Sequence, residues 1–157
     1  MKIGITGHQK LDNPDWVKQE TLRVICIESP PIIGVTCLAV GADQLFAQAV
    51  LECAGSLRVI VPCKDYIKVF NPAGRAEYER LLSKAAAIES PLVTDCNEEA
   101  YFSAGKKVVD ISDLVIAVWN GKPAAGLGGT ADVVNYARQA SKKIIYINPV
   151  LKTVEMM

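Results

Sequence analysis

The chain alternates short apolar runs with longer segments in which apolar and polar residues are mixed. Valine and isoleucine dominate the short runs. Each run ends at a glycine, a proline or a polar turn, which is typical of buried strands. The pattern predicts strands over residues 2–6, 33–40, 57–61, 91–94, 113–119 and 143–147.

The longer segments carry apolar residues at helical spacing, as Leu45, Ala49 and Cys53 do. Pro72 suits the first turn of a helix, and the Asn97 side chain can cap the N-terminus of the next one. The pattern predicts helices over residues 16–28, 42–54, 72 to about 88, from 97 onward, and 130 to about 141.

Strands that alternate with helices imply a parallel sheet, and apolar strands without alternation imply burial on both faces. Right-handed crossovers then give an α/β fold, a doubly wound, mainly parallel, Rossmann-like sheet with helices on both faces. The chain has 157 residues, so we expect one nucleotide-binding domain over residues 1–149 and a loose tail over residues 150–157.

The balance of charged residues indicates which kinds of binding partner to expect. Lys plus Arg and Asp plus Glu both number 17, and this neutral balance argues against nucleic acid, which usually needs a basic face. A small anion held by backbone amides is compatible with it. No stretch resembles a signal peptide or reaches the roughly 20 apolar residues of a membrane span, so we expect a cytoplasmic protein without membrane contact.

The chain has five cysteines and no C-x-x-C pair. Apolar surroundings favour small buried hydrophobes in a reducing compartment over disulfides or metal ligands. No cluster of Cys, His and carboxylates suggests a metal site, and we expect no cofactor. A magnesium ion that accompanies a phosphate is compatible with the sequence. The cysteines are Cys26, Cys37, Cys53, Cys63 and Cys96.

Polar residues and glycines gather where the predicted strands end. Ligands of doubly wound sheets bind beyond the carboxyl ends of the strands. The first strand ends in TGHQ, the second in VGAD and the fifth in WNGKPAAGLGGT. We therefore expect the ligand-binding residues to be Gly7, His8, Gln9, Gly41, Ala42, Asp43, Asn120, Gly121, Lys122, Gly126, Gly128, Gly129 and Thr130.

The glycine-rich loop before Thr130 is the most informative of these strand ends. Glycines let backbone N–H groups approach a ligand, and a helix that begins at Thr130 adds free N–H groups and the positive end of its dipole. The combination predicts a phosphate site formed by the amides of Gly128, Gly129 and Thr130, with Lys122 as a nearby cation.

Other polar side chains near the strand ends have two interpretations. Asp43 either stabilises a helix N-terminus or binds a ribose hydroxyl. His8 is the only histidine, and a loop histidine is more often a hydrogen-bonding residue than an acid–base catalyst. Tyr66 either stacks on a base or covers the core. Lys106 and Lys107 lie late in a predicted helix, where cations suit the helix dipole, and we interpret them as part of a solvated helix face.

Three stretches resemble a known superfamily: GITGHQ, LAVGADQLFAQAVLECAG, and SDLVIAVWNG followed by GLGGTADVVNYA. The superfamily joins the DNA-processing protein A fold to the Lonely Guy (lysine-decarboxylase-like) phosphoribohydrolases, with nucleoside 2-deoxyribosyltransferases more distant. The IAVW-GKPA-GGTADVV signature is most similar to bacterial members. The resemblance covers residues 3–149 and implies a Rossmann-like fold that binds nucleotides or phosphorylated ribosides.

The resemblance also shows that two catalytic residues of the phosphoribohydrolases are replaced in this chain. The phosphoribohydrolases carry P-G-G-x-G-T-x-x-E, and the position of the glutamate falls on Val133, with Asp132 one residue earlier. One residue rotates a side chain by ~100° around a helix, so Asp132 is a candidate catalytic residue in a changed geometry. An arginine of the family aligns with Ala104, and Lys106 is the nearest base.

A retained glycine loop beside two changed catalytic positions favours binding over hydrolysis. We therefore predict binding or sensing of a small nucleotide or phosphorylated riboside. The alternative is an N-glycoside hydrolase or transferase that acts on nucleoside monophosphates through Asp132. Relatives commonly assemble through helix faces, so the resemblance also implies a homo-oligomer.

Overall fold

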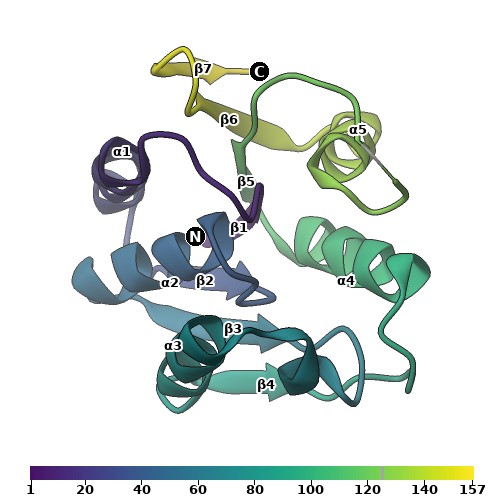
Figure 1. Ribbon diagram of the computed structural model, residues 1–157. Coiled ribbons are helices and arrows are strands. Elements are labelled where there is room, and N and C mark those ends of the chain that lie inside the picture. The colour runs from purple at the N-terminus through teal and green to yellow at the C-terminus, as the bar shows by residue number, and fades with distance from the viewer. Residues whose placement is uncertain (125) are drawn as a thin grey trace.

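A mostly parallel sheet forms the centre of the molecule in the computed structural model, which describes residues 1–124 and 126–157 (Figure 1). The strand order in the described residues is β4-β3-β2-β1-β5-β6-β7, and all neighbours are parallel except β6 and β7. This order confirms the predicted fold class. The strands are β1 (Lys2–Gly7), β2 (Ile33–Thr36), β3 (Ser56–Ile60), β4 (Ala87–Glu89), β5 (Leu114–Val118), β6 (Lys143–Asn148) and β7 (Thr153–Met156).

Helices cover both faces of the sheet. In Figure 1, α1 and α2 lie on one side, and α4 and α5 lie on the other. None of the described helices has the length and apolar character needed to cross a bilayer. The helices are α1 (Pro14–Cys26), α2 (Ala42–Glu52), α3 (Pro72–Leu82), α4 (Glu98–Ile111) and α5 (Thr130–Gln139), and a 3-10 turn, η1, spans Tyr66–Val69.

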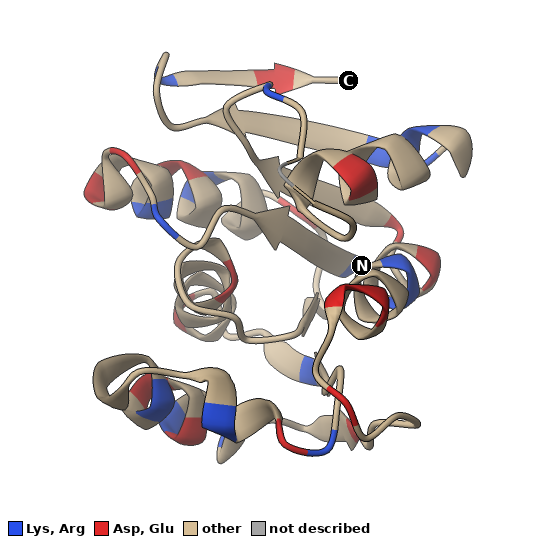
Figure 2. Cartoon of the chain, turned by 45° about the vertical axis from the view of Figure 1, so that its right-hand side comes forward, with Lys and Arg blue, Asp and Glu red and all other residues tan. Residues whose placement is uncertain are grey.

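The core depends on strands that are apolar on both faces. Every residue of β5 is buried, and Phe46 of α2 is completely shielded from solvent. Figure 2 shows the charged residues on helices, loops and the remaining strands, whereas β2 and β5 carry none. Burial of this apolar surface is the main favourable contribution to folding.

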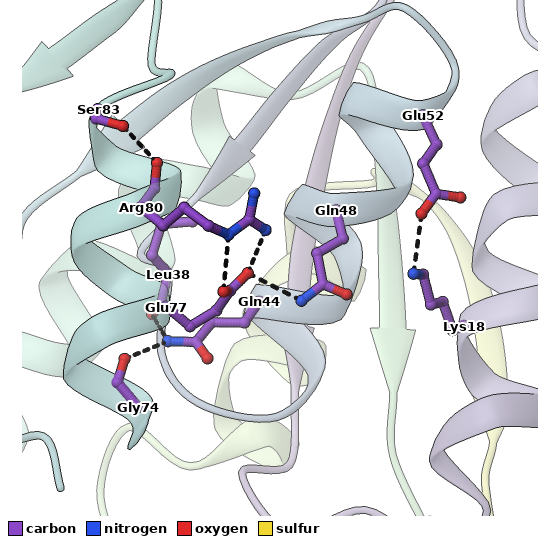
Figure 3. A network of polar contacts seen from close by, with 9 residues as sticks. All are labelled: Lys18, Leu38, Gln44, Gln48, Glu52, Gly74, Glu77, Arg80 and Ser83. Carbon is purple, nitrogen blue, oxygen red and sulfur yellow. Dashed lines mark hydrogen bonds and ion pairs between the residues drawn. The ribbon is translucent and has the colours of Figure 1, made fainter. Parts of the chain in front are cut away.

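A polar network attaches α3 to α2 (Figure 3). The buried amide of Gln44 donates to the carbonyl oxygens of Leu38, at 3.3 Å, and Gly74, at 3.1 Å. Gln48 donates to the Glu77 carboxylate at 3.0 Å. These contacts fix the start of α3, and with it the preceding loop, against the loop that follows β2.

The fourth strand lies earlier than predicted, and the helix before it is shorter. The alanine-rich stretch before Ile88 favours a helix locally. However, the Ala86 N–H donates to the Leu57 carbonyl at 2.9 Å, and the next residues pair with β3. Sheet pairing therefore outweighs local propensity and ends α3 at Leu82.

The prediction of a loose tail after Pro149 is wrong. The side-chain oxygen of Asn148 accepts hydrogen bonds from the N–H groups of Val150 and Leu151, both at 3.0 Å. This turn reverses the chain so that β7 pairs antiparallel with β6. The turn residues carried no hydrophobic pattern that could have signalled the last strand.

The prediction of unpaired cysteines is also wrong for four of the five. Disulfides join Cys26 to Cys53 and Cys63 to Cys96, and Cys37 is free. The first bridge attaches the end of α1 to the residue after α2, and the second attaches the loop after β3 to the residue before the α4 cap. Apolar surroundings suit a disulfide as well as a thiol, so burial alone did not discriminate between them.

We expect the double variant Cys26→Ser/Cys53→Ser to lose about 3 kcal/mol of unfolding free energy, because a bridge across a loop of this length restricts the unfolded chain. Urea unfolding without reductant measures the loss. Cys37→Ser, which leaves both bridges intact, is the control. Equal stability of the double variant and the wild type would contradict the Cys26–Cys53 bridge.

Candidate functional site

A cavity of about 920 Å³ opens at the carboxyl ends of β1, β2, β3 and β5. This is the edge of the sheet at which the sequence pattern predicted a ligand site. Four of the predicted site residues do not line the cavity: Gly41, Ala42, Gly121 and Asp132. The predicted residues that do are Gly7, His8, Gln9, Asp43, Asn120, Lys122, Gly126, Gly128, Gly129 and Thr130.

His8 connects three elements at the rim of this cavity. Its N–H donates to the Val118 carbonyl at 3.1 Å, and its own carbonyl accepts from the Ala42 N–H at 3.1 Å. Its ring Nε2 accepts from the Asn120 N–H at 3.2 Å. His8 therefore acts as a hydrogen-bonding residue of the scaffold, and Ala42 is held behind it.

Gly41 supports the site from behind. It precedes α2 with φ of 83°, a conformation that favours glycine, and a Cβ there would lie 2.3 Å from the Gln9 carbonyl oxygen. Any side chain at this position would displace the loop after β1. Gly41 thus allows the first loop and the start of α2 to approach each other.

The Asp132 side chain holds the glycine loop that follows β5 through a hydrogen bond. The Asp132 carboxylate accepts from the Gly128 N–H at 3.0 Å, and Gly128 has φ of 83°. The Gly129 N–H makes a long 3.5 Å contact with the Gly126 carbonyl. Within this loop, Ala125 lies outside the described residues.

The free amides at this end of the cavity lie one residue further along than predicted. No described residue accepts a hydrogen bond from the backbone N–H of Thr130 or Ala131, and both residues line the cavity at the start of α5. A helix N-terminus with unpaired N–H groups attracts an anion. The free N–H groups that were predicted at Gly128, Gly129 and Thr130 are therefore those of Thr130 and Ala131, because the Gly128 N–H is already bonded to Asp132.

The position that carries glutamate in the phosphoribohydrolases does face the cavity, because Val133 lines it whereas Asp132 does not. The position of the family's arginine differs, because Ala104 is buried in α4 and does not line the cavity. Lys106 lies over the ring of Phe102, 4.9 Å from its centroid, and is not a lining residue. The described cavity therefore has neither charged group at these two positions.

Asp43 lies on the cavity wall and is almost fully buried. Its carboxylate accepts from the Thr36 hydroxyl at 3.1 Å and from the Cys37 N–H at 3.2 Å. These bonds hold the chain where β2 ends, earlier than predicted, and Leu38 then adopts φ of 57°. Burial raises the pKa of Asp43 from 3.8 to about 6, although the two donors oppose this shift.

Sequence reasoning missed much of the opposite wall. Tyr66, left undecided in the sequence, lines the cavity together with residues from η1, the α3 cap and α4. No motif marks these residues, and only their places after β2, after β3 and at the start of α4 could have indicated them. The missed lining residues include Cys37, Phe70, Asn71, Glu98 and Tyr101.

Charged groups are few around the cavity. Among the described residues, its lining includes the carboxylates of Asp43 and Glu98 and the ammonium group of Lys122. Glu98 lies beside the glycine loop, since a Cβ on Gly126 would be 2.6 Å from its Oε1. No three His, Cys, Asp or Glu side chains of the described chain gather closely enough to hold a metal ion.

Comparison with known proteins identifies the class of fold. No protein-family model and no curated protein matches the chain. DNA processing protein A of Streptococcus pneumoniae shares the fold, with a TM-score of 0.68 and 15% identity over 92% of this chain and 49% of its own. DNA processing protein A of Helicobacter pylori gives 0.66 and 18%, over 93% and 64%. A molybdenum cofactor binding protein of Rippkaea orientalis gives 0.57 and 22%, over 94% and 76%.

These neighbours confirm the Rossmann-like fold that the sequence resemblance implied. The chain spans about half of the Streptococcus pneumoniae protein and less than two thirds of the Helicobacter pylori protein. The argument against nucleic acid as a partner is overturned, because the Helicobacter pylori neighbour is described as binding single-stranded DNA. Net charge averages over the whole surface and does not report the charge at one binding face.

The raised pKa of Asp43 predicts a pH-dependent stability. Its folded-state pKa exceeds the unfolded value, so its contribution is present below about pH 4 and is lost as the pH rises through about 6. An asparagine at this position would not titrate. Between pH 4 and pH 7, we therefore expect the unfolding free energy of Asp43→Asn to improve relative to wild type by up to about 3 kcal/mol.

Urea unfolding at a series of pH values measures this difference. Asp15→Asn, at an exposed aspartate in the first turn of α1, is the matched control and should follow the wild-type profile. Parallel profiles for Asp43→Asn and wild type across this range would contradict the burial effect.

Proposed function

We propose that the cavity binds a nucleotide or a phosphorylated riboside, with the phosphate at the N-terminus of α5. The observation that carries the proposal is the pair of unaccepted N–H groups of Thr130 and Ala131 inside a cavity of about 920 Å³. Small-molecule sites commonly have volumes of this order and a few well-placed polar groups.

The remaining lining supports the same orientation. Lys122 follows β5, as the loop that leads to Thr130 does, and can add a cation to the phosphate site. Gln9 and Asp43 line the cavity after β1 and β2, the two strands between β5 and β3, and a ribose would lie beside them. A buried carboxylate suits a sugar because it can accept a hydrogen bond from a hydroxyl.

The nucleotide can be free or part of a strand. The fold is shared with DNA processing proteins, one of them described as binding single-stranded DNA, so both sources of the same phosphate chemistry belong in the test. A free nucleotide presents a terminal phosphate to α5, whereas a strand presents phosphodiesters. The two can be compared directly on one protein.

The backbone donor of Thr130 can be removed without removing the helix. Thr130 is the first residue of α5, where proline is tolerated, and Gly129 before it has the extended backbone that a following proline requires. We expect Thr130→Pro to weaken binding of nucleoside monophosphates about tenfold or more, because a charge-assisted hydrogen bond is lost. Thr130→Ala, which keeps the N–H, should change affinity much less.

Isothermal titration with nucleoside monophosphates and with an oligothymidylate measures both sources. Tighter binding of the free nucleotide, with the Thr130→Pro loss, supports a small-molecule site. A loss confined to the oligothymidylate would assign the site to single-stranded DNA. Equal affinities of Thr130→Pro and Thr130→Ala for every probe would refute phosphate binding at α5.

Hydrolysis of an N-glycosidic bond is the second candidate, and Glu98 is the observation that favours it. Its carboxylate has no hydrogen-bond partner among the described residues and lies at the cavity beside Gly126. The Asp132 carboxylate, by contrast, already accepts a hydrogen bond from the Gly128 N–H. A carboxylate near the sugar can stabilise the positive charge that develops as such a bond breaks.

If hydrolysis occurs, we expect free base to accumulate over hours with wild type and to fall at least about tenfold with Glu98→Gln. Asp132→Asn tests the residue that the sequence suggested and should keep most of the activity. Proton NMR of the nucleotide mixtures resolves the free base. Binding without any base release would remove this second candidate.

A further inference from the structure

Aromatic rings from η1, from the residue after it and from α4 line one wall of the cavity. The Tyr66 ring lies between two others that also line the cavity, Phe70 at 5.0 Å and Tyr101 at 6.3 Å between centroids. Phe70 in turn stacks on the buried Tyr78, at 4.7 Å. Tyr78 therefore supports Phe70 from the core, and the wall combines rings from η1, the residue after it and α4.

The Tyr66 hydroxyl is an unpaired polar group inside this wall. Tyr66 is only 4% exposed, and no described residue forms a hydrogen bond with its hydroxyl. Among the described residues, the side-chain oxygen that is fully shielded and unpaired belongs to Thr21, so the Tyr66 hydroxyl retains access to solvent. Because Tyr66 lines the cavity, the hydroxyl meets solvent there.

The wall lies at a suitable distance from the N-terminus of α5. The η1 turn follows β3, whereas the loop that leads to α5 follows β5, and the sheet places β2 and β1 between them. Three steps between parallel strands span about 14 Å. An extended nucleotide is of this order in length, so a ligand held by its phosphate at Thr130 would reach Tyr66 with its other end.

We propose that the aromatic wall of Tyr66, Phe70 and Tyr101 receives the nucleobase, and that the Tyr66 hydroxyl donates a hydrogen bond to an acceptor on the base. This assignment rests on the proposed function and names the second half of the same site. Stacking on aromatic rings tolerates any base, whereas one fixed donor selects for an acceptor at one position.

The groups around the Tyr66 hydroxyl are suited to donation. Burial raises the pKa of Tyr66 and of the Cys37 thiol, and the neighbouring Asp43 carboxylate acts in the same direction. Both side chains therefore keep their protons at neutral pH. Asn71 adds an amide at the same end; its Oδ1 is occupied by the Gly74 N–H at 2.7 Å, which leaves its Nδ2 to donate.

Calorimetric titration of the full chain with the four ribonucleoside 5′-monophosphates and with ribose 5-phosphate tests the assignment. Ribose 5-phosphate keeps the phosphate and sugar but lacks the base. We expect it to bind wild type at least about tenfold more weakly than the preferred nucleotide, because stacking on a ring contributes that much per base.

Two variants locate the base. Tyr66→Phe removes only the hydroxyl and should weaken the preferred nucleotide about fivefold. Phe70→Leu removes a flat ring and should weaken all four nucleotides about tenfold. Both should bind ribose 5-phosphate as wild type does. The matched control is Tyr136→Phe, which removes a tyrosine hydroxyl that donates to Asp110 outside the cavity and should change nothing.

The outcomes separate the two levels of inference. Equal wild-type affinities for ribose 5-phosphate and the nucleotides, or unchanged nucleotide affinity in both Tyr66→Phe and Phe70→Leu, would overturn the base assignment while leaving the phosphate site intact. Weaker binding of ribose 5-phosphate by both variants would indicate a structural effect and would also overturn it. If no phosphorylated probe binds wild type, the proposed function fails together with this inference.

Discussion

The parallel pairing of β1 with β5 is the constraint on which the site depends. It aligns Gly7 with Val118, so that both strands end together at the point where the strand order reverses. His8, the next residue, bonds to Val118 and Asn120 at the end of β5 and to Ala42 at the start of α2, and so connects these segments around that point. Without this register, the glycine loop and the start of α2 would not face one cavity.

Much of this arrangement is predictable from the sequence because the strands are buried on both faces. Continuous apolar runs identified the strands, and a polar group after each run identified the edge at which the cavity opens. The predictions failed where tertiary contacts outweigh local pattern. Ala86 bonds to Leu57 of β3 instead of continuing a helix, and Asn148 turns the tail back toward the sheet. Pairing of Cys26 with Cys53 likewise depends on the packing of α1 on α2.

The site was predictable on the side with a motif and not on the other. Glycines mark places where backbone approaches a ligand, so the loop near Thr130 was visible in the sequence. Tyr66 and Phe70 lie in a short 3-10 turn and the residue after it, and only the fold brings them to the same cavity as the start of α5. Even within the motif, the Gly128 N–H donates to the Asp132 carboxylate, so that the free amides are those of Thr130 and Ala131.

The distribution of carboxylates supports binding over bond cleavage. Stabilising positive charge on a sugar requires an ionised carboxylate that can approach the ring. Asp43 is held by the Thr36 hydroxyl and the Cys37 N–H, and burial disfavours its charged form. Asp132 closes the glycine loop, and Val133 occupies the position that faces the cavity. Glu98 alone among these groups is free to act, and it is exposed to water, where its charge is screened. The proposed binding therefore draws on the free donors of Thr130, Ala131 and Tyr66, whereas a reaction would depend on one carboxylate, that of Glu98.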